Sequence, residues 1–97
     1  PAGTLCFNVK GQGTKINKMN AQWLAPSLCN WRIDWAIYYE GKTWWRDKGR
    51  THNTCSYGNN GRSRGRGYAP AGSEICAELY NTSRNRKIDA ACASITN

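Results

Sequence analysis

Three arginines alternate with small residues in one short stretch, at Arg62, Arg64 and Arg66, and Tyr68 follows. Arginine offers forked donors to phosphate or carboxylate, glycine allows close approach to the backbone, and a tyrosine ring stacks on a base or a sugar. The surrounding residues 58–72 are rich in glycine and lack branched aliphatic residues. They are predicted to form a flexible, exposed basic loop. Either the loop is a solvated segment that keeps the protein soluble, or it contacts a polyanion.

A second candidate surface combines indoles with cations. Its members are Trp44, Trp45, Arg46, Lys48 and Arg50. Exposed tryptophan beside arginine is typical of binding hot spots and of contacts with sugars or membrane interfaces. Since neighbouring residues in a strand point to opposite faces, we expect Trp44 and Trp45 to do so, which leaves at most one free for a partner.

Two catalytic arrangements would use His52, the single histidine of the chain. It precedes Cys55 by three residues, which would suit a thiol nucleophile and its base, but that spacing does not ensure proximity. A ribonuclease would use Glu40 as base, His52 as acid, and Arg46 or Arg50 on the phosphate. Nothing in the spacing requires this trio to meet. No serine elbow, phosphate loop or carboxylate dyad is present, so we predict no catalytic residues and no cofactor.

The five cysteines are widely spaced and form no Cys-x-x-Cys or Cys/His cluster, so no metal site is predicted. Such spacing suits disulfides that close long loops, which points to an oxidising compartment and therefore to secretion. The sequon Asn81-Thr82-Ser83 agrees with secretion. Two bridges leave one cysteine over, and sequence does not choose among the pairings. We predict that Cys55 is the spare thiol, either buried and inert or linking two chains in a dimer.

The net charge of +8 on 97 residues predicts attraction to polyanions, whether nucleic acid, acidic glycan or the headgroups of anionic lipids. The length predicts a single domain over residues 1–97.

The N-terminal half predicts a strand, a helix and a hairpin. Leu5, Phe7 and Val9 alternate in a strand over Thr4–Lys10. Thr14 is a plausible N-cap for a helix over Lys15–Ala25, where Ile16, Met19 and Trp23 share one face and Pro26 follows. A strongly alternating strand over Trp31–Tyr39 then turns at residues 40–42 into a strand over Thr43–Arg46.

The C-terminal half predicts a similar unit. After a short strand over Thr54–Tyr57, Ile75, Ala77 and Leu79 alternate, and one face of a terminal helix is marked by Ile88, Ala91, Cys92 and Ile95. We therefore predict an α+β fold, with a small antiparallel sheet and two helices packed on one face, stabilised by disulfides. In this arrangement the two strand cysteines can lie near each other, or each can pair with its own helix, as Cys6 to Cys29 and Cys76 to Cys92.

The sequence combines cysteines in predicted strands and helices with many tryptophans and a basic surface. The strand cysteines are Cys6 and Cys76, and those after or within predicted helices are Cys29 and Cys92. This combination resembles the small secreted cysteine-containing effector and killer-toxin proteins of fungi. The resemblance implies a virulence or antagonism protein, with a ferredoxin-like sandwich, that binds a host or competitor protein. It carries no functional residue over to this chain.

The first hypothesis is therefore a secreted, non-catalytic binding protein of effector or toxin type. It would use the loop at Arg62–Tyr68 and the turn at Trp44–Arg50 against a protein or an anionic partner. The arginine-glycine stretch also resembles segments of RNA-binding proteins, so the alternative is an RNA-binding domain whose affinity falls steeply with salt. A small ribonuclease is the third hypothesis.

Overall fold

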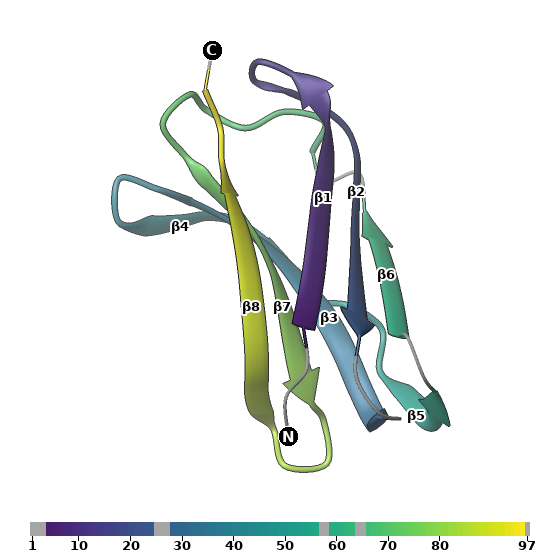
Figure 1. The fold of residues 1–97 in the computed structure, drawn as a ribbon. Helices are drawn as coiled ribbons and strands as arrows, with labels where there is room; N and C mark the ends of the chain where they lie inside the picture. The colour runs from purple at the N-terminus through teal and green to yellow at the C-terminus, as the bar shows by residue number, and fades with distance from the viewer. Residues whose placement is uncertain (1–3, 25–27, 57–58, 64–65, 97) are drawn as a thin grey trace.

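The fold was analysed in a computed structural model that describes residues 4–24, 28–56, 59–63 and 66–96, with the side chains of 54, 56 and 59–62 left aside. These residues form eight β-strands and no helix (Figure 1). The strands are β1 (Thr4–Gln12), β2 (Lys15–Leu24), β3 (Leu28–Tyr39), β4 (Lys42–Asp47), β5 (His52–Ser56), β6 (Asn59–Ser63), β7 (Glu74–Asn81) and β8 (Arg86–Ser94).

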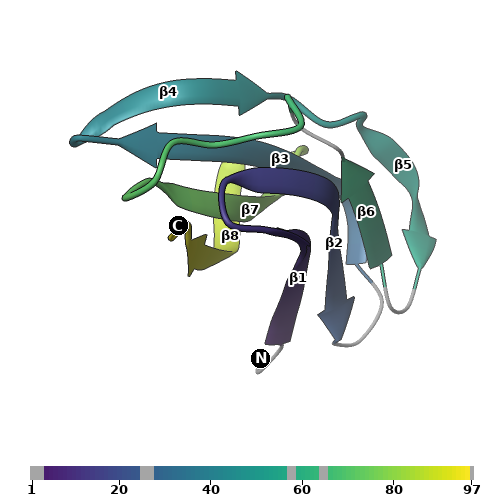
Figure 2. The same ribbon diagram turned by 90° about the horizontal axis from the view of Figure 1, so that it is seen from above.

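The strands make two antiparallel sheets. One has the order β1-β2-β6, and the other has the order β4-β3-β7-β8 with β5 also paired to β3. The two sheets face each other as layers of a sandwich (Figure 2). The predicted α+β fold with two helices on one face is therefore wrong, and the described chain is all-β. In the described residues no helix has the length and apolar character needed to cross a membrane.

The first predicted helix, over residues 15–25, is replaced by strand β2. Lys10 pairs with Lys18 and Gly11 with Ile16, which leaves Asn17 as an extra residue in a bulge. This insertion places Ile16 and Met19 three residues apart although both face the core, so the spacing imitates one face of a helix.

The predicted terminal helix is replaced by strand β8, and of the residues predicted to share one helical face only Ala91 and Ile95 contact the core. Leu79 pairs with Asp89 and Tyr80 with Lys87, so Ile88 is the extra residue and is exposed. Beyond this bulge the strand continues in regular register with β7. Each predicted strand-turn-helix unit is thus a β-hairpin.

The strand predicted over Trp31–Tyr39 is confirmed within β3, which pairs with β4, β5 and β7. The predicted hairpin to β4 is also confirmed. Its turn places Glu40 and Gly41 at φ of 52° and 75°, as a two-residue hairpin turn requires.

The core fills the space between the two sheets. Its residues come from both layers, and the fully buried ones include Met19 from one sheet and Ile37, Ile75 and Leu79 from the other. The buried members are Leu5, Ile16, Met19, Ala21, Trp23, Trp31, Ile33, Trp35, Ile37, Ala69, Ile75, Ala77, Leu79 and Ile95. Strand β3 supplies four of these residues and pairs with other strands along both edges, so the core and the sheet fix its position.

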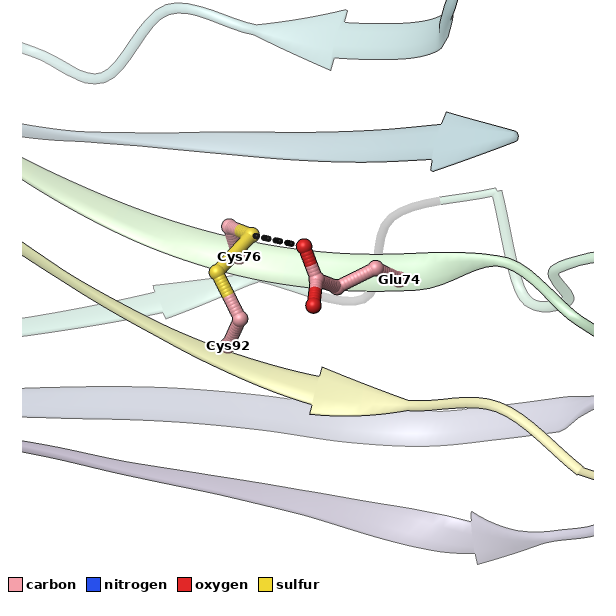
Figure 3. Close-up of side chains that lie close together, drawn as sticks. All are labelled: Glu74, Cys76 and Cys92. Atoms are coloured by element: carbon pink, nitrogen blue, oxygen red, sulfur yellow. Dashed lines mark hydrogen bonds between the residues drawn. A yellow bond between two sulfur atoms is a disulfide. The ribbon is translucent and has the colours of Figure 1, made fainter. Parts of the chain in front are cut away.

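Two disulfides are present, as predicted. Cys76 on β7 is bonded to Cys92 on β8 (Figure 3), which confirms that predicted pair. Cys29 on β3 is bonded to Cys55 on β5, so the predicted bridge between Cys6 and Cys29 is wrong. Cys6 is the free thiol and is exposed, whereas Cys55 was the expected spare. The predicted pairing of Cys29 relied on a helix over residues 15–25, which does not form. Strand β5 lies against β3 and brings Cys55 opposite Cys29, so these two cysteines are bonded.

Candidate functional site

The two surfaces predicted from the sequence meet at one place. The guanidinium carbon of Arg66 lies 5.3 Å from the centre of the Trp44 ring and 5.8 Å from that of Tyr68. The Trp44 and Tyr68 rings contact each other edge to face, with centres 5.5 Å apart. We call Trp44, Arg66 and Tyr68 the cation–aromatic cluster. It combines a positive charge with two aromatic rings, and Tyr68 is 47% exposed.

A bulge in β4 positions Trp44. Tyr38 pairs with Thr43 and Ile37 with Trp45, so Trp44 is the extra residue. Both tryptophans are half-buried and pack against the core, which corrects the expectation that they point to opposite faces. Trp44 nevertheless keeps enough exposed surface to contact Arg66 and Tyr68.

The segment that carries Tyr68 is fixed to the β1–β2 hairpin. The backbone N–H of Ile16 donates to the carbonyl of Gly67 at 2.8 Å, and that of Ala69 donates to the carbonyl of Thr14 at 2.9 Å. Ala69 is fully buried, so it anchors the segment beside Tyr68. Within the cluster, Trp44 therefore belongs to one sheet, whereas Tyr68 is attached to the other.

Beside the cluster, the β3–β4 turn forms an open hollow with a volume of about 450 Å³. It is lined by Tyr39, Glu40, Lys42, Thr43 and Trp44. Hydroxyl, carboxylate and ammonium groups thus lie next to the aromatic rings, and the hollow falls in the size range of small-ligand sites.

Arg46 has a different environment from Trp44. Asp34 on β3 and Glu78 on β7 are cross-strand partners and are both 2% exposed. Arg46 bridges them, with its guanidinium 3.1 Å from Asp34 Oδ2 and 2.8 Å from Glu78 Oε1. Arg32 donates to Asp34 Oδ1 at 2.9 Å, and the backbone N–H of Gly49 donates to the same oxygen at 3.0 Å. We call this group the buried ion cluster.

Two tyrosines and a lysine complete the surroundings of Glu78. The Tyr38 hydroxyl donates to Glu78 Oε2 at 2.6 Å, the Tyr80 hydroxyl donates to Oε1 at 3.5 Å, and Lys87 lies 3.7 Å from Oε2. Burial raises the pKa of Glu78, but the hydrogen bonds from Tyr38 and Arg46 and the nearby positive charges outweigh it, so the pKa lies below its usual value. The hydrogen bond to Glu78, together with burial, raises the pKa of Tyr38, which stays a donor.

The ion cluster is suited to stabilising the sheet rather than to catalysis. Both oxygens of Glu78 already accept hydrogen bonds, and its lowered pKa keeps it ionised, so it is a poor proton acceptor for a substrate. Arg46, predicted as a binding residue, is committed to these internal ion pairs.

The ribonuclease trio does not assemble. His52 pairs with Trp31 near the start of β3 and stacks on its ring, with centres 4.0 Å apart. Glu40 follows the other end of β3, nine residues along the strand, or about 30 Å at the usual rise per residue. The thiol–histidine arrangement also fails because Cys55 is bonded to Cys29.

No family model, curated protein or solved structure matches the chain.

Among the described residues, one group of potential metal ligands lies close together: Glu74, Cys76 and Cys92 (Figure 3). Glu74 Oε1 is 3.9 Å from the sulfur of Cys76. Both sulfurs are bonded to each other, so neither is a thiolate that could bind a metal ion.

Lys48, Arg50 and the backbone of Arg62 belong to other parts of the described structure. Lys48 and Arg50 are exposed in the segment after β4, near Gly49 and the buried ion cluster. Arg62 lies on β6, where its backbone pairs with Asn20 of β2, so the stretch predicted as a loop over 58–72 contains a strand. Arg64 lies outside the described residues.

Sequence reasoning missed the buried ion cluster. Its signal was present, because Arg32, Asp34 and Tyr38 occupy alternate positions of the clearest predicted strand. A charged face on so apolar a strand indicates partners on neighbouring strands. The partners themselves could not be named before the pairing of β3 with β7 was known.

Proposed function

We propose that the chain is a secreted, non-catalytic binding domain of effector or toxin type, and that the cation–aromatic cluster contacts its anionic partner. The observation that carries the proposal is the convergence of Trp44 with Arg66 and Tyr68 from distant parts of the chain. Among the described residues, no carboxylate pairs with Arg66. Its hydrogen-bond donors are therefore available to an acidic group of a partner.

The two disulfides support the secreted part of the proposal, since such bonds persist in oxidising compartments. The net charge of +8 favours anionic partners and speeds their encounter. Charge alone would give diffuse binding, whereas the half-exposed Tyr68 ring adds a position-specific contact.

The test is elution by salt from a column that carries a sulfated polysaccharide. Arg66→Ala and the matched control Arg84→Ala each remove one positive charge, and Arg84 is an exposed residue of the β7–β8 turn, at the far end of β3 from the cluster. We expect Arg66→Ala to elute at clearly lower salt than Arg84→Ala. Tyr68→Ala should also elute early although its charge is unchanged.

If Arg66→Ala matches Arg84→Ala and Tyr68→Ala matches the parent protein, the retention reflects only net charge and the proposed site is wrong. Equal urea midpoints for all proteins ensure that the comparison is made on folded chains.

A further inference from the structure

The chemistry around the cation–aromatic cluster also limits the kind of polyanion that fits it. We infer that the ligand is an acidic polysaccharide whose sugar rings carry carboxylates. One carboxylate would be held by the Arg66 fork, with a neighbouring sugar ring on Tyr68 and the hollow of the β3–β4 turn. This inference rests on the proposed function and names its ligand.

Arg66 is placed to hold a carboxylate. Its guanidinium carbon lies 5.3 Å from the centre of the Trp44 ring and 5.8 Å from that of Tyr68, and attraction to these rings orients the side chain. A carboxylate accepts two parallel hydrogen bonds from such a fork. Because these ring contacts already restrict the exposed side chain, less rotamer freedom is lost on binding.

The cluster offers a small exposed aromatic area. Strands of nucleic acid bind without sequence preference by stacking successive bases on several free aromatic faces. Here Trp44 is half-buried, and of the two rings in the cluster only that of Tyr68, a residue that is 47% exposed, offers a large free surface. One exposed ring suits a single sugar, whose C–H face is apolar and whose edge is polar.

The hollow of the β3–β4 turn has a polar lining. Glu40 and Thr43 are exposed and can accept hydrogen bonds from sugar hydroxyls, and Lys42 can attract a second carboxylate. Each sugar ring of the polysaccharide offers more than one hydroxyl donor to Glu40, whereas the backbone of RNA offers only its 2′-hydroxyl. Lys15 is exposed and its backbone bridges to Tyr68, so it adds positive charge on the other side.

The experiment compares three probes by calorimetry in the same buffer: an oligomer of galacturonic acid, a neutral galactose oligomer of equal length, and a single-stranded oligouridylate. We expect the acidic sugar to bind most tightly. Arg66→Lys keeps the charge but loses the fork, so it should weaken this binding on the order of tenfold, whereas the control Arg84→Lys should not change it.

Tyr68→Ala should weaken binding of the acidic sugar by a similar factor. The inference is overturned if oligouridylate binds more tightly than the acidic sugar through the same residues, an outcome that leaves the proposed function standing. It is also overturned if the neutral oligomer binds as well as the acidic one. If no probe binds in a way that depends on Arg66 or Tyr68, and the sulfated column is equally insensitive to them, both proposals fail.

Discussion

The buried ion cluster should make a large contribution to stability, and Arg46→Met tests it. Removing one partner of a buried ion pair typically costs about 3–5 kcal/mol, because a charge is left buried without compensation. Arg46 is 35% exposed, and each carboxylate keeps another partner, Arg32 for Asp34 and Tyr38 for Glu78. The expected loss of unfolding free energy is therefore about 2–3 kcal/mol.

Urea unfolding followed by tryptophan fluorescence measures this loss. With a slope of about 1 kcal/mol per M for a domain of this size, the midpoint should fall by about 2–3 M. The control Arg84→Met removes an equally long cation from an exposed turn and should change the free energy by no more than about 0.5 kcal/mol.

The effect of Arg46→Met should also depend on pH. The folded-state pKa of Glu78 is lowered, so its ionised form adds stability above the unfolded-state pKa of about 4.3, and this stability is lost as the pH falls through the folded pKa. Without Arg46 the folded pKa rises, so less stability is lost on acidification. The gap between parent and variant should therefore narrow from pH 7 towards pH 3. A gap that stays constant over this range, or a variant as stable as the parent, would refute the reasoning.

Three further outcomes are expected. In the native protein one thiol, Cys6, should react with a labelling reagent, and a second reactive thiol found by mass spectrometry would contradict the disulfide assignment. Gly49→Ala should destabilise by about 1–3 kcal/mol in urea, because the added Cβ would collide with the Ile33 carbonyl oxygen; an unchanged midpoint would mean that the segment moves freely. Replacing Cys76 and Cys92 together by serine should cost about 3 kcal/mol for a bridge spanning 16 residues, and a cost near zero would count against a constrained loop.

The strands of this fold could be predicted where the alternation of the sequence is uninterrupted. The prediction succeeded in β3, which pairs with β7 without a bulge over this stretch. The side chains that face the core there are those of Trp31, Ile33, Trp35 and Ile37. In β2 and β8 a single extra residue shifts the period, at Asn17 and Ile88, and local patterns then favour a helix. Bulges depend on the partner strand, so a single chain segment does not reveal them.

The candidate site was predictable in its parts but not in its assembly. The sequence indicated Trp44 and Arg66 with Tyr68 as separate surfaces, from residue types alone. That these surfaces meet depends on tertiary contacts that fix residues 67–69 to the β1–β2 hairpin. The same limit explains the wrong pairing of Cys29, whose partner was decided by which strand lies beside β3.

The placement of the disulfides divides the molecule into two unequal parts. Both bridges connect strands of the same sheet, β3 with β5 and β7 with β8, while the layer formed by β1, β2 and β6 contains only the free Cys6. In partial opening, the uncross-linked layer can therefore separate while the cross-linked sheet keeps its pairing. Amide protons of β1 and β2 should then exchange with solvent before those of β3 and β7. Residues 67–69, which include Tyr68 of the candidate site, are hydrogen-bonded to that less protected layer. Binding of a ligand to Tyr68 would therefore also slow amide exchange in this layer and couple recognition to the stability of the sandwich.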